Sequence, residues 1–194
     1  MNRCFLSLLL LLSACESGGG DLALHPEVAK VDPGVGAYAE GYVIDSSVGS
    51  LKGIYVGMSE SELSSLRYSE SRGVANFEGE EFVTVNVALD GRVSLDCVLN
   101  EDGSVYRFST VSPLVRDEKG LGVGTALYEL KAAYPEGKFL VGDEDGRFAS
   151  FVNGSRVIFS LGKERIDELC FDEPTAKCEV DEKGVKVERV VVSE

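Results

Sequence analysis

The middle of the chain alternates between apolar and polar residues with the two-residue period of a β-strand. Residues 82–89 (Phe-Val-Thr-Val-Asn-Val-Ala-Leu) and 93–99 (Val-Ser-Leu-Asp-Cys-Val-Leu) follow this pattern. They are separated by Asp90-Gly91, a dipeptide typical of tight β-hairpin turns. A second turn at residues 100–103 leads into another run at 105–111. The pattern predicts an antiparallel meander, and we expect a similar series of strands between residues 148 and 192.

Apolar residues at helical spacing precede the first meander. Leu63 and Leu66 lie three positions apart, and Ser59 is followed by Glu62, the spacing of a capping box. In such a box each of the two side chains accepts a hydrogen bond from the other residue's backbone amide at the start of the helix. The sequence therefore predicts a short helix that begins after Ser59.

A second short helix is predicted further along the chain. Leu127, Leu130 and Tyr134 recur on one helical face, Thr125 is placed to cap the first turn, and Pro135 ends the run. Each predicted helix has one apolar side, which we expect to lie on the sheet.

The two halves of the chain resemble each other. Residues 53–63 align with 120–130, and residues 97–105 align with 178–185 in the same order. These matches favour a tandem duplication, although glycine-rich turns also produce chance similarity. The predicted fold class is α+β, with two tandem units, each a short helix followed by an antiparallel β-meander. The first unit is expected over residues 41–115 and the second over 116–194.

The start of the chain has the features of an export signal. Arg3 is followed by a short apolar run and by Ser13-Ala14-Cys15, and this run is too short to span a bilayer. Residues 1–14 are therefore predicted to be a signal peptide. Residues 15–40 carry glycine, serine and proline without apolar periodicity, and they are predicted to be a flexible tether.

The segment Leu12-Ser13-Ala14-Cys15 resembles the cleavage site of bacterial lipoproteins. The resemblance implies that the mature chain begins at Cys15, with a diacylglyceryl group on its thiol and a fatty acyl group on the new amine. Glu16 is not the aspartate associated with retention in the inner membrane, so the resemblance favours the periplasmic face of the outer membrane. The inner membrane and the cell surface stay open as alternatives, as does an ordinary secretory signal with an incidental cysteine.

The motif Gly-x-x-Val-Gly-Met/Thr opens both aligned blocks, at Gly53 and at Gly120. It resembles the repeats of small outer-membrane assembly lipoproteins of the BamE (SmpA/OmlA) group and of β-lactamase inhibitory proteins, the latter with two tandem copies. The second opening also resembles uncharacterised bacterial lipoproteins. These resemblances imply a binding or scaffolding protein of the envelope, with envelope proteins as partners. The alternative is a proteinaceous inhibitor of a periplasmic or secreted enzyme.

Composition narrows the function further. The chain carries 33 acidic and 19 basic residues, a formal net charge of −14, so nucleic acid is not an expected partner. The only histidine, His25, lies in the predicted tether, and no clustered metal ligands occur. We therefore expect neither an enzyme nor a cofactor or metal.

The acidic segment 143–146 (Asp-Glu-Asp-Gly) is predicted to be a hairpin turn, because Asp and Gly are the residues that tight turns require. Its spacing does not match that of a calcium-binding loop. The oligomeric state stays open.

Three cysteines, Cys97, Cys170 and Cys178, lie in the predicted folded part of the chain, and each can be either paired or free. Cys170 and Cys178 bracket a short loop, and an oxidising compartment favours a disulfide between them. Cys97 lies on the apolar side of a predicted strand and is expected to be a buried thiol, with pairing to either of the other two as the alternative.

Tyr106 and Arg107 are the candidate interface residues. They lie in the third strand of the first meander, where amphipathic side chains alternate with core positions. Tyrosine and arginine are frequent anchors of protein interfaces. We expect them on the sheet surface between the two copies.

Overall fold

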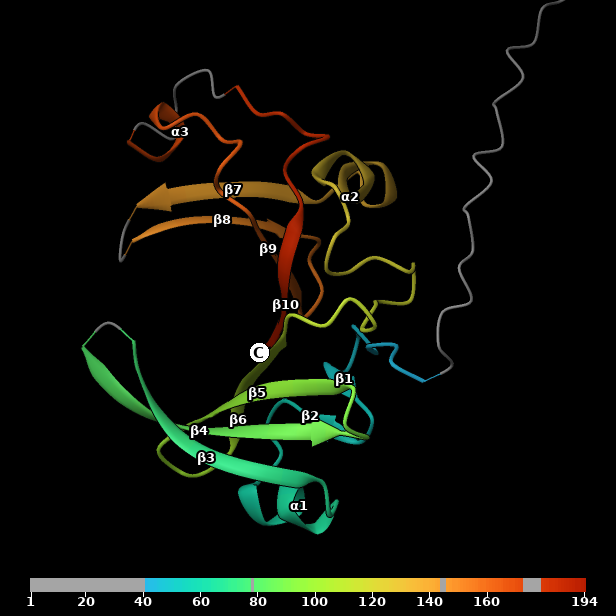
Figure 1. Cartoon of the computed structure of the whole chain (residues 1–194), viewed down its shortest axis with the longest axis vertical. Coiled ribbons are helices and arrows are strands. Elements are labelled where there is room, and N and C mark those ends of the chain that lie inside the picture. Colours follow the sequence, from blue (N-terminus) through green and yellow to red (C-terminus); the bar gives the residue numbers. More distant parts are fainter. Residues whose placement is uncertain (1–40, 78, 144–145, 173–178) are drawn as a thin grey trace, which may run out of the picture. The chain divides into compact units, whose positions relative to one another are not determined.

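The polar and apolar alternation is realised in one large antiparallel sheet. The computed structural model describes residues 41–77, 79–143, 146–172 and 179–194. In this part of the chain an eight-stranded sheet has the order β3-β4-β5-β6-β10-β9-β8-β7 (Figure 1). Its strands are β3 (Ser69–Phe77), β4 (Glu80–Leu89), β5 (Val93–Leu99), β6 (Val105–Thr110), β7 (Lys138–Asp143), β8 (Arg147–Val152), β9 (Val157–Leu161) and β10 (Val187–Ser193). A separate pair consists of β1 (Ser50–Leu51) and β2 (Ile54–Tyr55).

The predicted meander is confirmed in β4, β5 and β6. Leu89 pairs with Val93 across the turn, and Asp90 and Gly91 both have positive φ angles, 45° and 72°. Such angles match the right-handed twist of the flanking strands, which is why Asp-Gly suits this position.

Two strands, β3 and β7, were not predicted from the sequence pattern. β3 follows α1 and has mostly exposed side chains, including Ser71 and Arg72, so it shows no alternation. β7 lies at the opposite edge of the sheet. An edge strand is held by backbone hydrogen bonds on one side and needs fewer buried side chains than a central strand.

The helices are short. α1 (Glu60–Ser65) begins after Ser59 with the predicted capping box, and α2 (Leu127–Ala133) is followed by its C-cap residue, Tyr134. The prediction that Thr125 caps α2 is wrong, because Ala126 occupies the cap position and its amide donates to Glu129 Oε2 at 2.8 Å. Thr125 Oγ1 instead accepts the Gly122 amide at 3.0 Å.

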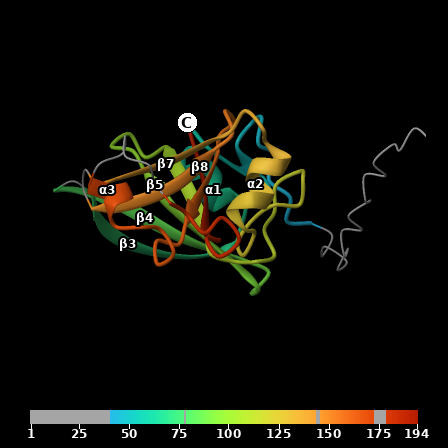
Figure 2. The same cartoon turned by 90° about the horizontal axis from the view of Figure 1, so that it is seen from above.

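A third helix, α3 (Leu169–Asp172), has four residues. Figures 1 and 2 show α2 and α3 near opposite ends of β7 and β8. Within the described ranges, no helix has the length and apolar character needed to cross a membrane.

The predicted α+β class is wrong. The described chain is mostly β, with one continuous eight-stranded sheet and helices of only six, seven and four residues, rather than two tandem helix-then-meander units. The reason lies in β10, which pairs with β6 on one side and with β9 on the other. Val190 is opposite Thr110 in β6 and Phe159 in β9, so this last strand joins all the others into one sheet. The division at residues 115 and 116 stays a prediction.

One face of the sheet carries the core. Buried apolar side chains from every strand except β3 and β7 lie on this face, and Leu63 of α1 and Leu130 of α2 belong to the same cluster. Phe108, Phe151 and Phe159 are the largest fully buried side chains. We call the opposite side the open face. It carries the alternate residues, among them Thr84, Asp96, Ser109, Ser150, Ile158 and Val191.

A buried carboxylate organises the loop before α2. Asp117 is 2% exposed and accepts the amides of Lys119 and Leu121 at 2.9 and 2.8 Å and the hydroxyl of Tyr134 at 2.6 Å. Burial and this hydrogen bond raise the pKa of Tyr134. These contacts connect the loop at residues 117–121 to the end of α2.

Several predicted features lie outside the described residues. They are the signal peptide at 1–14, the lipidation site Cys15, the tether at 15–40 with His25, residues 144–145 of the predicted turn, and Cys178.

Candidate binding surface on the open face

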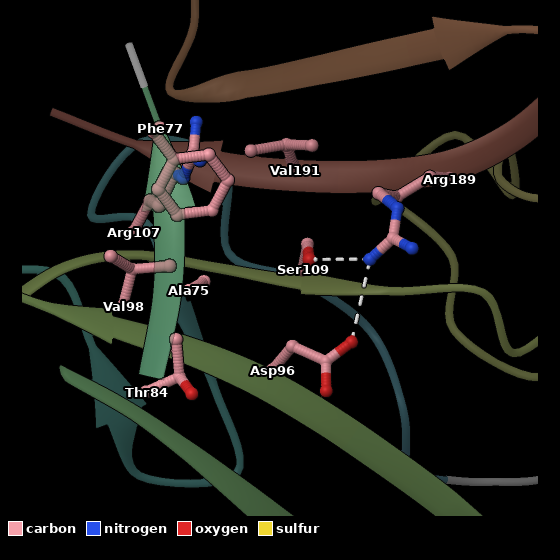
Figure 3. A pocket seen from close by; sticks show the side chains of 9 residues that line it. All are labelled: Ala75, Phe77, Thr84, Asp96, Val98, Arg107, Ser109, Arg189 and Val191. Atoms are coloured by element: carbon pink, nitrogen blue, oxygen red, sulfur yellow. Dashed lines mark hydrogen bonds and ion pairs between the residues drawn. The ribbon is translucent and has the colours of Figure 1, made fainter. Parts of the chain in front are cut away.

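The open face is hollowed where five strands lie side by side. A cavity of about 470 Å³ opens between side chains of β3, β4, β5, β6 and β10 (Figure 3). Its lining mixes apolar and polar groups: Ala75, Phe77, Val98 and Val191 with Thr84, Asp96, Arg107, Ser109 and Arg189. The cavity therefore offers both apolar area and polar side chains to a ligand.

Strand register brings these residues together. Ser109 in β6 is opposite Asp96 in β5 and Val191 in β10, while the intervening residues Cys97, Phe108 and Val190 face the core. Because side chains alternate along each strand, burying one set turns the other set to the open face.

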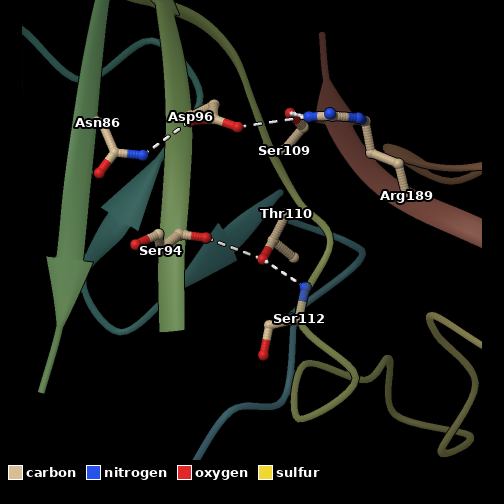
Figure 4. A network of polar contacts seen from close by, with 7 residues as sticks. All are labelled: Asn86, Ser94, Asp96, Ser109, Thr110, Ser112 and Arg189. Atoms are coloured by element: carbon tan, nitrogen blue, oxygen red, sulfur yellow. Dashed lines mark hydrogen bonds and ion pairs between the residues drawn. The ribbon is translucent and has the colours of Figure 1, made fainter. Parts of the chain in front are cut away.

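Arg189 is held by polar contacts across three strands. Its Nη1 donates to Ser109 Oγ at 3.0 Å and lies 3.4 Å from Asp96 Oδ2 (Figure 4). Asp96 Oδ1 in turn accepts from Asn86 Nδ2 at 2.8 Å. The Arg189 and Asp96 side chains are about half exposed, so this ion pair orients the arginine more than it stabilises the fold.

A second set of polar contacts involves Thr110, the last residue of β6. The buried Thr110 hydroxyl donates to the Ser94 carbonyl at 2.9 Å and accepts the Ser112 amide at 3.1 Å (Figure 4). Because both partners are backbone groups, the hydroxyl satisfies polar atoms at the end of the strand.

Arg107 makes a different set of contacts. Its guanidinium carbon lies 4.5 Å from the centre of the Phe77 ring and 5.9 Å from that of Tyr106. Among the described residues, no hydrogen bond or ion pair involves this guanidinium. Arg107 thus lies over the Phe77 ring, and its N–H donors are unused within the described part of the chain.

A β-bulge explains why Tyr106 and Arg107, although consecutive in a strand, line the same cavity. Val98 is opposite Arg107, but the next residue, Leu99, is opposite Val105, so Tyr106 is the extra residue in β6. Tyr106 is 38% exposed and lines a second cavity of about 220 Å³ with Phe77, Arg107 and others. The structure brings the two predicted interface residues to one place, while their role as an interface stays a prediction.

Sequence reasoning missed Phe77, Asp96 and Arg189. The sequence of residues 187–193 (Val-Glu-Arg-Val-Val-Val-Ser) could have pointed to Arg189, because this arginine lies among apolar residues of a strand whose valines are partly buried in the core. Phe77 carried no such signal, because β3 has no regular pattern.

The cysteines do not form a reactive site in the described chain. Cys97 is a free, fully buried thiol, and burial together with the nearby charges of Asp96 and Glu70 raises its pKa to about 12. A thiol with so high a pKa is a poor nucleophile. Cys170 is buried in α3, and its predicted disulfide with Cys178 stays a prediction.

The predicted turn at residues 143–146 is described only at its two ends. Asp143 ends β7 and is opposite Arg147 at the start of β8, so the residues on either side of the turn belong to adjacent antiparallel strands. Among the residues that the structure describes, no three His, Cys, Asp or Glu side chains are grouped to hold a metal ion.

Comparison with known proteins identifies a fold relative. No family model and no curated protein matches this sequence. The crystal structure of the uncharacterised protein YfeY from Escherichia coli is similar, with a TM-score of 0.52 and 18% identity. The similarity covers 78% of this chain and 99% of that chain. At this identity the likeness shows the fold alone.

Proposed function

We propose that this protein is a binding module of the bacterial envelope, anchored by lipid on Cys15 to the periplasmic face of the outer membrane. It acts by docking an envelope protein rather than by catalysis. The observation that carries the proposal is the open face, where a mixed apolar and polar cavity is left uncovered by the described part of the chain.

Exposed apolar residues support docking on this face. Phe77 on β3, Leu140 on β7 and Phe148 on β8 are each between 37% and 43% exposed, and strand register places all three on the open side. Large apolar side chains on one uncovered sheet face are typical of interaction surfaces.

Aromatic residues beside an arginine add to this argument. Tyr106 and Phe77 flank Arg107 at the rim shared by the two cavities. Tyrosine and arginine contribute most to binding when they occupy the centre of an interface and are desolvated by the partner. The partner is therefore a protein with complementary apolar and anionic groups.

The test is crosslinked affinity capture from intact envelopes. The native chain is compared with Cys15→Ser, with the double variant Tyr106→Ala and Arg107→Ala, and with Tyr128→Ala as a control. Tyr128 is 45% exposed on α2, so its variant removes an exposed tyrosine outside the candidate surface.

We expect the native chain and Tyr128→Ala to capture the same outer-membrane proteins. Capture should fail with Cys15→Ser and with the double variant. Capture that the double variant leaves unchanged would refute docking on the open face. Recovery of one soluble enzyme in a one-to-one complex, by both the lipidated and unlipidated chains, would refute the assembly role and favour an inhibitor.

A further inference from the structure

We propose that Arg107 is the anchor for an acidic side chain of the docked protein, which enters the open-face cavity together with a neighbouring apolar side chain. This inference rests on the proposed docking function and specifies the chemistry of the partner. It follows from the orientation of Arg107, from its available donors and from the charge of the cavity.

The Arg107 guanidinium is oriented before any partner arrives. Its central carbon lies over the Phe77 ring, 4.5 Å from the ring centre, and 5.9 Å from the centre of the Tyr106 ring (Figure 3 shows Phe77 and Arg107). A cation–π contact of this kind is made with the ring face and does not use the N–H groups as hydrogen-bond donors to another polar group. A side chain already held in place loses less conformational entropy when it binds.

The two arginines of the cavity differ in how their donors are used. Arg189 donates to Ser109 and pairs with Asp96, whereas the Arg107 guanidinium has neither kind of contact within the described residues. The charged lining therefore consists of two cations and one carboxylate. The first cavity therefore carries one more cationic than anionic side chain, in a chain whose formal net charge is −14. The neighbouring cavity adds the carboxylate of Glu80 beside Arg107, so the excess of positive charge is confined to the larger cavity.

Carboxylate is the group that fits this arrangement. The edge of a guanidinium presents two parallel N–H donors that match the two oxygens of a carboxylate. Ala75, Val98 and Val191 line the same cavity, so a carboxylate beside an aliphatic side chain meets both parts of the lining. A volume of about 470 Å³ holds a few side chains and lies in the usual range of ligand pockets.

The test uses two short peptides and the purified full chain. Acetyl-Leu-Asp-Leu-amide is the probe, and acetyl-Leu-Asn-Leu-amide has the same shape without the negative charge. Binding is followed by NMR through the side-chain Nε–H resonance of Arg107, assigned with the Arg107→Gln variant. We expect the Asp peptide to shift this resonance and the Asn peptide to bind about tenfold more weakly, since a charge-assisted hydrogen bond is lost.

Variants separate recognition from net charge. Arg107→Gln should abolish the preference for the Asp peptide, and Arg107→Lys should restore only part of it because lysine lacks the planar fork. Arg165→Gln makes the same change of charge at a residue outside the cavity and should leave the preference intact.

The outcomes distinguish this inference from the docking function. Equal binding of the two peptides, or a response of Arg107 to inorganic phosphate but not to the Asp peptide, would overturn the acidic anchor. If envelope capture nevertheless depended on Tyr106 and Arg107, docking on the open face would stand. A strong Asp preference with envelope capture that ignores the open face would overturn docking and retain the carboxylate site.

Discussion

Asp117→Asn should destabilise the fold by a moderate amount, and Asp117→Ala should destabilise it far more. The asparagine keeps one oxygen for the amides of Lys119 and Leu121, which the aspartate accepts at 2.9 and 2.8 Å. At the other position an NH₂ group replaces the oxygen that accepts from Tyr134 at 2.6 Å. The tyrosine hydroxyl then rotates to accept, so a charged hydrogen bond becomes a neutral one.

The expected magnitudes follow from these contacts. Replacing a charge-assisted bond by a neutral one lowers the free energy of unfolding by about 1–2 kcal/mol. Alanine leaves three donors around a site that is 2% exposed without their acceptor, which lowers it by about 3–5 kcal/mol. Asp143→Asn is the control, since that aspartate forms an exposed ion pair with Arg147. This substitution should lower the free energy of unfolding by about 1 kcal/mol at most.

Urea unfolding of the single variants, Tyr134→Phe and the double variant Asp117→Asn with Tyr134→Phe tests this reasoning. Both substitutions remove the same charge-assisted hydrogen bond between Asp117 and Tyr134, so the double variant should be less destabilised than the sum of the singles. Equal losses for Asp117→Asn and Asp117→Ala, or strict additivity in the double variant, would refute the assigned contacts.

Further predictions concern the core, the cap and the thiol. Phe159→Ala should lower the free energy of unfolding by about 3–5 kcal/mol, measured by chemical denaturation, since the ring is fully buried; a loss below 1 kcal/mol would contradict its place in the core. Ser59→Ala removes the capping box and should lower the free energy of unfolding by about 1 kcal/mol, whereas Ser71→Ala, at an exposed position of β3, should change it by about 0.5 kcal/mol at most. The Cys97 thiol should resist iodoacetamide at pH 8 until the chain unfolds, because a pKa of about 12 leaves on the order of one thiolate in ten thousand; rapid labelling of Cys97 in the native protein, located by mass spectrometry, would count against its burial.

The candidate surface was only partly visible in the sequence. Tyr106 and Arg107 are adjacent in the chain, and the sequence pattern predicts both as interface residues. Phe77 and Arg189 belong to strands far from them in sequence, and only the register of the strands from β3 through β6 to β10 places the four residues around two neighbouring cavities. The bulge in β6 also could not be read from the residues, since it depends on how β5 pairs with that strand.

Local features were determined by short stretches of sequence. The turn at Asp90-Gly91 and the capping box of Ser59 and Glu62 depend on groups within three or four residues, and the structure confirms both. The lipoprotein signal that ends at Cys15 is equally local, and it stays a prediction.

The fold class was decided by tertiary structure. The helix patterns were real, but they extend for only two turns or less, and β10 pairs with a strand about 80 residues earlier in the chain. Such a pairing joins two regular meanders into one sheet, and no residue in either strand specifies it alone. Sequence determined the turn at Asp90-Gly91, the cap of α1 and the apolar side of the alternating strands, because those depend on neighbouring residues. Only the folded chain decided which strands meet, and therefore which side chains share the open face, because that choice depends on burying the apolar sides of all the strands at once.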